Sequence, residues 1–468
     1  MLEPAYQADV VVVGAGVAGL SAAHRLTSAG VTTMVLEAAH GVGGRMGTEK
    51  IDGFRLDRVG QLLSTAYPEL RLTPGLGGLA LRPFAPGVLL HGDGRHHRAG
   101  VQQGSGGARG ALHAVRTLAS APRQPSVPRP LRRPVAVPGR QVSVPRSRPG
   151  APLGTAVDQA RLGAALTRLA GTPAERLLAR PELPAGAALA ARGLPARTID
   201  GFLRPLLAAL LCDPDLTTSS RCADLALRAF AGGRLCLPEG GAGALPERLA
   251  QMLPAGTVHT GVRVTSVSTT SVTTAEHGEI RCRAVLVATG ARAAAELLPG
   301  LRVPEFHPVT VVHHTTDEPP GTGASLLLDA DLGGPVAHTA VVSQVDPSRA
   351  PAGRALVSST VLGRPPGDVD TAVRMHLARL YGVSTARWET LAVHHTAEAV
   401  PAMRPPHDLR RPVRLLAGLY VCGDHRDTST VQGALHSGHR ASAAILADLG
   451  AGRSMHVADP VPSVPRAA

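Results

Sequence analysis

The chain has 468 residues, of which 44% are hydrophobic and 18% are charged, and its formal net charge at pH 7 is +13. This length exceeds what one typical domain needs, so we expect two domains with sizeable hydrophobic cores. The five cysteines are scattered and form no C-x-x-C pair, which argues against a disulfide framework or a zinc site and favours small buried side chains.

The first predicted element is a strand over residues 10–13, followed by a glycine turn and a helix over residues 18–29. The run of four valines is typical of a buried parallel strand, and Gly14, Gly16 and Gly19 follow it at the spacing G-x-G-x-x-G. Gly14 permits the tight turn, Gly16 allows the backbone to approach a pyrophosphate, and Gly19 allows the helix to pack closely on the strand. The helix then directs its positive N-terminal end towards the phosphates.

A second predicted strand over residues 32–36 ends at Glu37. At this place in a βαβ unit a carboxylate accepts hydrogen bonds from the adenosine ribose and repels a 2′-phosphate, so Glu37 disfavours NADP. A lone glycine motif also occurs as a structural turn, but here strand, helix, second strand and acid stand in the expected order. The segment therefore predicts a bound dinucleotide.

Four further segments carry a resemblance to a known family. They read GVGGRM at residues 41–46, GVRVTSV at 261–267, AVLVATG at 284–290 and GLYVCGDHRDTSTVQGALHSGHRASAAIL at 418–446. In these segments the sequence resembles the FAD-dependent amine oxidoreductase superfamily, and especially its carotenoid (phytoene) desaturase-like branch. The resemblance covers both ends and the middle of the chain and implies FAD as the cofactor.

The resemblance implies a role for particular residues in these segments. Gly43 and Gly44 would let the chain pass close to the flavin's phosphates, and Arg45 would offer its guanidinium to an anionic oxygen. The backbone of Val264 would meet the adenine. Asp424 would hold the ribityl or pyrophosphate region of the cofactor.

Two segments are expected to lie against the flavin ring. The resemblance places the backbone of Gly60 and Gln61 near the ring, and it places the N-terminus of the helix after Gly433 on the O2 side. A helix dipole there would stabilise negative charge on the reduced flavin. The expected cofactor-binding residues are Gly14, Ala15, Gly16, Gly19, Glu37, Ala38, Gly43, Gly44, Arg45, Gly60, Gln61, Val264, Gly423, Asp424, Gly433 and Ala434.

Residues 94–157 carry most of the net positive charge. They include eleven arginines and no acidic residue, and residues 121–150 hold eight prolines. No periodicity there could bury an apolar face, so we expect a disordered insertion that trypsin cuts between Arg109 and Arg148. A nucleic-acid-binding arm and a sequence artefact are the alternatives. Because no aromatic residue is available to stack on bases, we expect no nucleic-acid partner.

The rest of the chain predicts an α+β substrate domain. The predicted elements are strands around a hairpin turn at Asp93-Gly94, helices over 157–169 and 199–211, an antiparallel sheet within 310–362 and a helix over 369–380. The apolar helix over 199–211, interrupted by Pro205, is either core or the wall of an apolar substrate tunnel, and core is the more common case.

Together these elements predict an α/β fold in which a Rossmann-like FAD-binding domain is combined with a discontinuous α+β substrate domain. We assign residues 1–75, 235–300 and 400–450 to the FAD-binding domain and residues 76–234 and 301–399 to the substrate domain. Residues 94–157 form the insertion, and residues 451–468 form a flexible tail.

No catalytic residue is predicted. Lys50 is the only lysine of the chain, and it follows the GVGGRM segment, whereas amine oxidases place a lysine near flavin N5 from the substrate domain. Thr430 stands where amine oxidases have an aromatic ring beside the flavin. Both absences argue against efficient amine oxidation.

The twenty histidines do not predict a metal site. The adjacent pairs His313-His314 and His394-His395 would point to opposite faces of a strand, so neither pair can readily chelate one ion. His425 and His436 lie in or beside the C-terminal flavin signature and are the histidines we would test there.

The expected function is FAD-dependent dehydrogenation or desaturation of a small apolar, isoprenoid-like substrate by hydride transfer to the flavin. An amine oxidase-type flavoenzyme and a non-catalytic FAD-binding protein with a degraded substrate domain are the alternatives. The first residues, MLEPAYQADVV, contain no signal-like segment, so we expect a cytoplasmic protein. The arginines of residues 94–157 would also attract an anionic membrane surface, which adds peripheral membrane association to the expectations.

Overall fold

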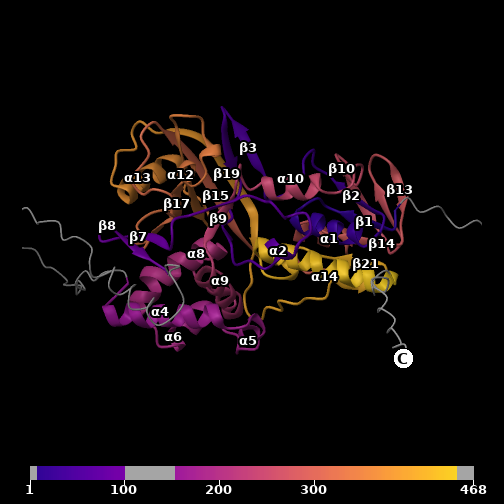
Figure 1. Cartoon of the computed structure of the whole chain (residues 1–468), viewed down its shortest axis with the longest axis horizontal. Helices are drawn as coiled ribbons and strands as arrows, with labels where there is room; N and C mark the ends of the chain where they lie inside the picture. The colour runs from indigo at the N-terminus through magenta and orange to yellow at the C-terminus, as the bar shows by residue number, and fades with distance from the viewer. Residues whose placement is uncertain (1–7, 101–152, 451–468) are drawn as a thin grey trace, which may run out of the picture.

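The computed structural model describes residues 8–100 and 153–450. Most of the predicted insertion, residues 101–152, and the predicted tail, residues 451–468, lie outside the described residues. Figure 1 shows one region that contains α1 and α14 and a second region in which strands lie between helices. Within the described ranges, no helix combines the length and the apolar character needed to cross a membrane.

The first region is built on a six-stranded sheet with the order β10-β2-β1-β14-β21-β20. Neighbouring strands run parallel, except that β20 and β21 are antiparallel. The strands are β1 (Val10–Val13), β2 (Thr33–Glu37), β10 (Val258–Thr260), β14 (Ala284–Val287), β20 (Arg414–Leu416) and β21 (Leu419–Val421). This sheet confirms the predicted Rossmann-like α/β architecture.

All four valines of β1 are buried because the sheet is covered on both faces. Val10 and Val12 belong to a core shared with three helices, and Val11 and Val13 belong to a second core on the other face. The helices of the first core are α1 (Val17–Ser28), α10 (Ala244–Gln251) and α14 (Val431–Leu449). The second core includes the three-stranded sheet β11 (Val264–Val267), β12 (Ser271–Thr274) and β13 (Gly278–Arg281), and helix α11 (Ala291–Leu297).

Two glycines allow helix α1 to pack closely on its neighbours. A Cβ added at Gly19 would lie 2.1 Å from the carbonyl oxygen of Gly14, and a Cβ at Gly438 of α14 would lie 2.4 Å from that of Ala18. Neither approach is sterically allowed, so only glycine fits at these contacts. The first and the last described helices are therefore in direct contact (Figure 1).

The second region is built on a seven-stranded mixed sheet with the order β19-β15-β18-β17-β16-β7-β8. Its strands are β7 (Val88–Gly92), β8 (Arg95–Ala99), β15 (Phe306–Thr316), β16 (Leu327–Asp329), β17 (Val336–Val341), β18 (Ala355–Leu362) and β19 (Glu389–Pro401). One face packs against α13 (Val369–Tyr381). The predicted antiparallel sheet and the predicted helix after it are confirmed.

The other face of this sheet packs against a helical layer. The layer contains α4 (Ala156–Gly171), α5 (Ala174–Leu178), α6 (Ala185–Ala191), α7 (Ala196–Thr198), the π-helical turn η1 (Ile199–Leu203), α8 (Arg204–Leu211) and α9 (Ser220–Gly232). In Figure 1 these helices lie below the sheet, and α13 lies above it.

Smaller elements connect the two regions. They are the hairpin of β3 (Thr48–Ile51) and β4 (Phe54–Asp57), the sheet of β5 (Leu63–Ser64), β9 (Leu235–Pro238) and β6 (Leu81–Pro83), the short helices α2 (Glu69–Leu72) and α12 (Val342–Val345), and the 3₁₀ turns η2 (Pro347–Arg349) and η3 (Asp424–Arg426). The domain boundaries given above remain a prediction.

The prediction of a disordered insertion over residues 94–157 is wrong at both ends of this range, where the residues are folded. Strand β8 pairs with β7 around the predicted Asp93-Gly94 turn, and Leu153 is buried in the core under α4. Thr155 caps α4 by accepting a hydrogen bond from the backbone N–H of Asp158. Both outer parts of the segment are thus folded because each has a partner strand or a cap.

Candidate functional site

The predicted glycine turn lies between β1 and α1, at the carboxyl edge of the parallel sheet. Gly14 has a φ of +107°, which favours glycine, and a Cβ there would lie 3.0 Å from the carbonyl oxygen of Ala288. A Cβ at Gly16 would meet no atom within 4 Å. The turn is therefore tightly packed where Gly14 meets Ala288, and it has open space at Gly16. A bound pyrophosphate requires such an opening beside the backbone.

Glu37 at the end of β2 holds this turn in place. One carboxylate oxygen accepts a hydrogen bond of 2.8 Å from the backbone N–H of Ala15, and the other accepts one of 2.9 Å from that of Ala39. The sequence predicted a ribose ligand here and did not predict the bond to the turn. Contact of Glu37 and its exposed neighbour Ala38 with a ribose stays a prediction.

The GVGGRM segment lies directly beside the glycine turn. Gly43 bridges to Gly16, and its N–H donates a hydrogen bond of 2.9 Å to the carbonyl oxygen of Ala15. Gly43 and Gly44 have φ values of +108° and +57°, which favour glycine. The structure thus brings together two predicted phosphate-binding segments.

Arg45 and Asp424 form a bidentate ion pair, with both N–O distances at 2.7 Å. Arg45 also donates a hydrogen bond of 2.8 Å to the carbonyl oxygen of Ala399 on β19. Burial alone would raise the pKa of the Asp424 carboxyl, but the guanidinium of Arg45 holds that pKa below its usual range. The sequence predicted that each residue would contact the cofactor and did not predict that they would contact each other.

The predicted C-terminal signature forms β21, η3 and the start of α14. The N–H of Gly423 donates a hydrogen bond of 2.9 Å to Ser437 Oγ, and Thr430 Oγ1 accepts one of 3.1 Å from the N–H of Gly433. A Cβ at Gly433 would lie 1.9 Å from the carbonyl oxygen of Thr428. Thr430 is therefore the N-cap of α14, and Ala434 lies on the first turn of that helix. The positive end of the helix faces the pocket described next.

A small pocket lies at the N-terminus of α14. Gly60 and Gln61 line it, and their predicted contact with a flavin ring stays a prediction. The pocket is lined by Val59, Gly60, Gln61, Leu62, Ala209, Leu210, Cys212, His338, Thr360, Val400, Ser429, Thr430 and Val431. None of these side chains carries a full charge at neutral pH, and most are apolar.

His338 on β17 is one of the polar side chains of this pocket that the sequence analysis did not single out. It is only 6% exposed, and its Nδ1 has no hydrogen-bond partner among the described residues. Burial lowers its pKa to about 4, so the ring is neutral at physiological pH. A lone histidine within a strand gives no sequence signal, which is why His338 was missed.

Other predicted residues lie around this centre. The segment before Val264 contacts the end of β2, because the N–H of Val262 donates a hydrogen bond of 2.9 Å to the carbonyl oxygen of Glu37. His425 lies behind the ion pair, 4.0 Å from Asp424, and burial lowers its pKa to about 4. His436 instead pairs with Asp427 at 2.8 Å.

The structure places Lys50 and Thr430 in different surroundings. Lys50 lies exposed on β3 and is not among the residues that line the pocket. Thr430 stands at the entry to α14, and among the described residues no Phe, Tyr or Trp side chain lines the pocket with it. The role of a lysine near the flavin is therefore not filled by Lys50.

Comparison with known proteins identifies the family. The pattern of the flavin containing amine oxidoreductases matches residues 17–446. Putrescine oxidase of Kocuria rosea is 45% identical over 98 residues, which is 20% of each chain, so the match spans about one fifth of that curated relative.

Two solved structures share the fold along nearly their whole length. A putative protoporphyrinogen oxidase from Exiguobacterium superposes with a TM-score of 0.65 at 17% identity, covering 96% of this chain and all of the other (100%). Cyclohexylamine oxidase from Brevibacterium oxydans superposes with a TM-score of 0.62 at 18% identity, covering 95% and 99% of the two chains. The comparisons favour the amine oxidases over the predicted desaturase branch. The chain belongs to the flavin containing amine oxidoreductase family and is an FAD-dependent flavoprotein.

Proposed function

We propose that this protein oxidises a small, largely apolar monoamine, using FAD as the hydride acceptor. The observation that carries the proposal is the pocket at the N-terminus of α14, which is mostly apolar and has no carboxylate among its lining residues. The named relatives, putrescine oxidase and cyclohexylamine oxidase, support an amine as the substrate.

Three features of the first region support a site for the phosphates and the ribose of FAD. The open space at Gly16 and the neighbouring turn at Gly43 would receive the pyrophosphate, and Glu37 would face the ribose. FAD bound there would supply a hydride acceptor for a carbon of the substrate. The N-terminal end of α14 would favour the negative charge that the cofactor gains.

The pocket residues would select the substrate by charge. A diamine such as putrescine carries a second ammonium group, and burying a cation without an anionic partner costs several kcal/mol, so diamines are disfavoured. A monoamine with an apolar ring or chain instead buries its hydrocarbon part against Val59, Leu210 and Val400.

Desaturation of an apolar, isoprenoid-like substrate is the second candidate. It is favoured by the exposed position of Lys50, the only lysine, and by Thr430 in place of an aromatic ring. Both observations led us to expect poor amine oxidation, and hydride abstraction from a hydrocarbon needs fewer polar side chains.

Anaerobic reduction of the flavin separates the candidates. The FAD-loaded protein is mixed with cyclohexylamine, putrescine or an isoprenoid, and the loss of visible flavin absorption is followed. We expect cyclohexylamine to reduce the flavin at least about tenfold faster than putrescine. Reduction by the isoprenoid alone would establish the second candidate, and no reduction by any donor would indicate a non-catalytic FAD-binding protein.

A single substitution tests the charge argument. Gln61→Glu places a carboxylate in the pocket with almost no change of shape, so it should raise the rate with putrescine relative to cyclohexylamine. Glu279→Gln, a change of the same atoms on the exposed strand β13, should leave that ratio unchanged. An unchanged ratio in Gln61→Glu would contradict this substrate pocket.

A further inference from the structure

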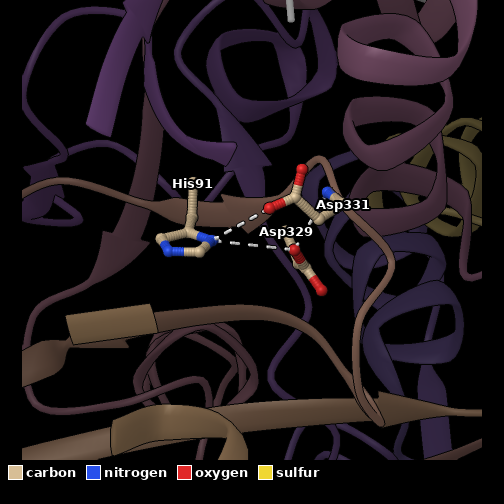
Figure 2. A group of neighbouring side chains, drawn as sticks. All are labelled: His91, Asp329 and Asp331. Atoms are coloured by element: carbon tan, nitrogen blue, oxygen red, sulfur yellow. Dashed lines mark hydrogen bonds and ion pairs between the residues drawn. The ribbon is translucent and has the colours of Figure 1, made fainter. Parts of the chain in front are cut away.

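A buried imidazole and two carboxylates converge in the seven-stranded sheet, outside the pocket described above. His91 Nδ1 lies 4.0 Å from Asp329 Oδ1 and 3.7 Å from Asp331 Oδ2. One ligand atom from each of the three residues lies within 4.8 Å of the other two. Figure 2 shows the three side chains pointing towards one another.

Strand pairing places the first two residues together. β7 and β16 run parallel, and His91 is the register partner of Asp329. Side chains of register partners project from the same face of a sheet, so the pairing of β7 with β16 makes the imidazole and the carboxylate neighbours. Asp331 follows two residues later, in the loop between β16 and β17.

The carboxylates are held in place by donors other than His91. Asp329 accepts hydrogen bonds from the backbone N–H groups of Asp331, at 3.1 Å, and Gly333, at 2.7 Å. Asp331 accepts from the backbone N–H of Asp93 at 3.1 Å. These bonds orient the carboxylates and leave further lone pairs free to face His91 Nδ1.

His376 on α13 adds a further oriented contact. Its Nδ1 accepts the N–H of Val336 at 3.1 Å, so a neutral ring carries its proton on Nε2. That Nε2 lies 3.0 Å from Asp329 Oδ2 without forming a hydrogen bond within the described part of the chain. The contact places a second buried imidazole beside the carboxylate.

The interior of the cluster lacks a positive group. His91 is 3% exposed, and its Nδ1 has no hydrogen-bond partner within the described part of the chain. Arg379 lies 4.0 Å from the other oxygen of Asp329, Oδ2, and its side chain is about half exposed. The imidazole nitrogen and the two carboxylates thus face one another without a hydrogen bond from Nδ1 within the described residues.

The geometry points to a divalent metal site formed by His91 Nδ1, Asp329 and Asp331, with Zn²⁺ as the ion that this donor set fits best. Zn²⁺ binds imidazole nitrogen and carboxylate oxygen at about 2.0–2.2 Å, and two such ligands of a tetrahedral site lie about 3.4 Å apart. The observed 3.7 Å and 4.0 Å need only a small contraction. Two carboxylates balance the charge of the ion.

The site would clamp the edge of the sheet. β7 is held to β16 by only three register pairs, and β7 and β8 are the last two strands in the order of the sheet. An ion shared between β7 and the β16–β17 loop would fasten the β7–β8 hairpin to the rest of the sheet. The role of the ion would be structural and independent of the flavin. This proposal departs from the sequence-based expectation of no metal site, which covered all twenty histidines.

The test is metal binding by the full-length, FAD-loaded protein after dialysis against a chelator. Titration with Zn²⁺ alone should show a saturable site, and Zn²⁺ should raise the unfolding temperature. Asp331→Asn keeps an oxygen for the N–H of Asp93 and lies at the surface, so the variant should fold. It should bind Zn²⁺ at least about tenfold more weakly and should lose most of the thermal shift.

Asp317→Asn is the matched control, because Asp317 is also an exposed aspartate but lies outside the cluster. It should bind Zn²⁺ like the wild type. If Asp331→Asn binds Zn²⁺ with unchanged affinity, the ion sits elsewhere and the proposal fails. If the wild type shows no saturable Zn²⁺ binding, the proposal fails as well.

Discussion

Arg45 and Asp424 are 379 positions apart in the sequence, yet their side chains are joined by two parallel hydrogen bonds of 2.7 Å. The pair connects the segment after the glycine turn with the C-terminal signature. The two segments that the sequence predicted to bind FAD are therefore fixed to each other.

The free energy of unfolding in acidic solution should depend on Asp424. Its folded pKa is lowered from 3.8, so its ionised form contributes stability above about pH 4, and this contribution is lost as the pH falls through the folded pKa. Asp424→Asn should lower the free energy of unfolding at pH 7 by about 2 kcal/mol, since Arg45 is one-third exposed and partly solvated. Urea denaturation between pH 3 and 7 checks this, with Asp317→Asn as control. An equal loss at all pH values would exclude the ion pair as the cause.

Gly16→Val should abolish FAD binding without unfolding the protein. The new side chain enters the open space where the pyrophosphate belongs, and its Cβ meets no protein atom within 4 Å. Gly77→Val is the matched control, because its Cβ also lies in open space but in an exposed loop. Absorption spectra of the purified variants give the FAD content. A yellow Gly16→Val protein with unchanged stoichiometry would refute the assignment of this turn.

Glu37→Ala should weaken FAD binding about tenfold or more. It removes the two acceptors that hold the N–H groups of Ala15 and Ala39, and charged hydrogen bonds contribute about 1.5–3 kcal/mol. Glu37→Gln keeps one oxygen and should lose less. Fluorescence titration with FAD measures both constants, and equal affinities for wild type and Glu37→Ala would contradict the role.

His338→Gln should make the protein less sensitive to mild acid. The unfolded pKa of His338 is 6.5 and the folded pKa is about 4, so protonation favours unfolding and stability is lost as the pH falls from 6.5 to 4. The loss amounts to roughly 3 kcal/mol for this group. The exposed His277→Gln is the control, and thermal unfolding across this range is the measurement. Parallel pH profiles for wild type and His338→Gln would contradict a buried neutral ring.

The five cysteines should resist alkylation in the native protein. All five are buried, and burial raises the pKa of Cys212 and Cys422 to about 12, so almost no thiolate forms at neutral pH. Mass spectrometry after iodoacetamide treatment should detect labelling only in denaturant. Rapid labelling of Cys212 in the native state would mean that the pocket opens widely enough to ionise it.

Local signals predicted the βαβ unit well. Strand β1 spans the predicted residues and α1 differs by one residue at each end, because valine runs, glycines and the helix period act within a few residues. The helix over 199–211 was less accurate, since it divides into η1 and α8. Pro205 lies in the first turn of α8, where a missing N–H is tolerated.

Long-range pairing limited the prediction of the sites. His91 and Asp329 become neighbours only because β7 pairs with β16, and the sequence around either residue does not predict this pairing. The same holds for His338, which reaches the pocket through its place on β17. Gly14, Gly16, Gly19 and Glu37 could be identified because their spacing is characteristic of one short βαβ unit.

The contact between α1 and α14 has a consequence for biosynthesis. Strand β2 pairs with β1 and is made soon after it, but β14, the partner of β1 on its other edge, begins only at Ala284, and β21 and α14 come later still. One edge of β1 and the face of α1 that α14 covers therefore stay without their final partners until these segments have been made. Such a topology folds slowly and exposes apolar strands in the meantime, so cofactor loading follows translation and chaperone binding to the nascent chain should favour the first strand.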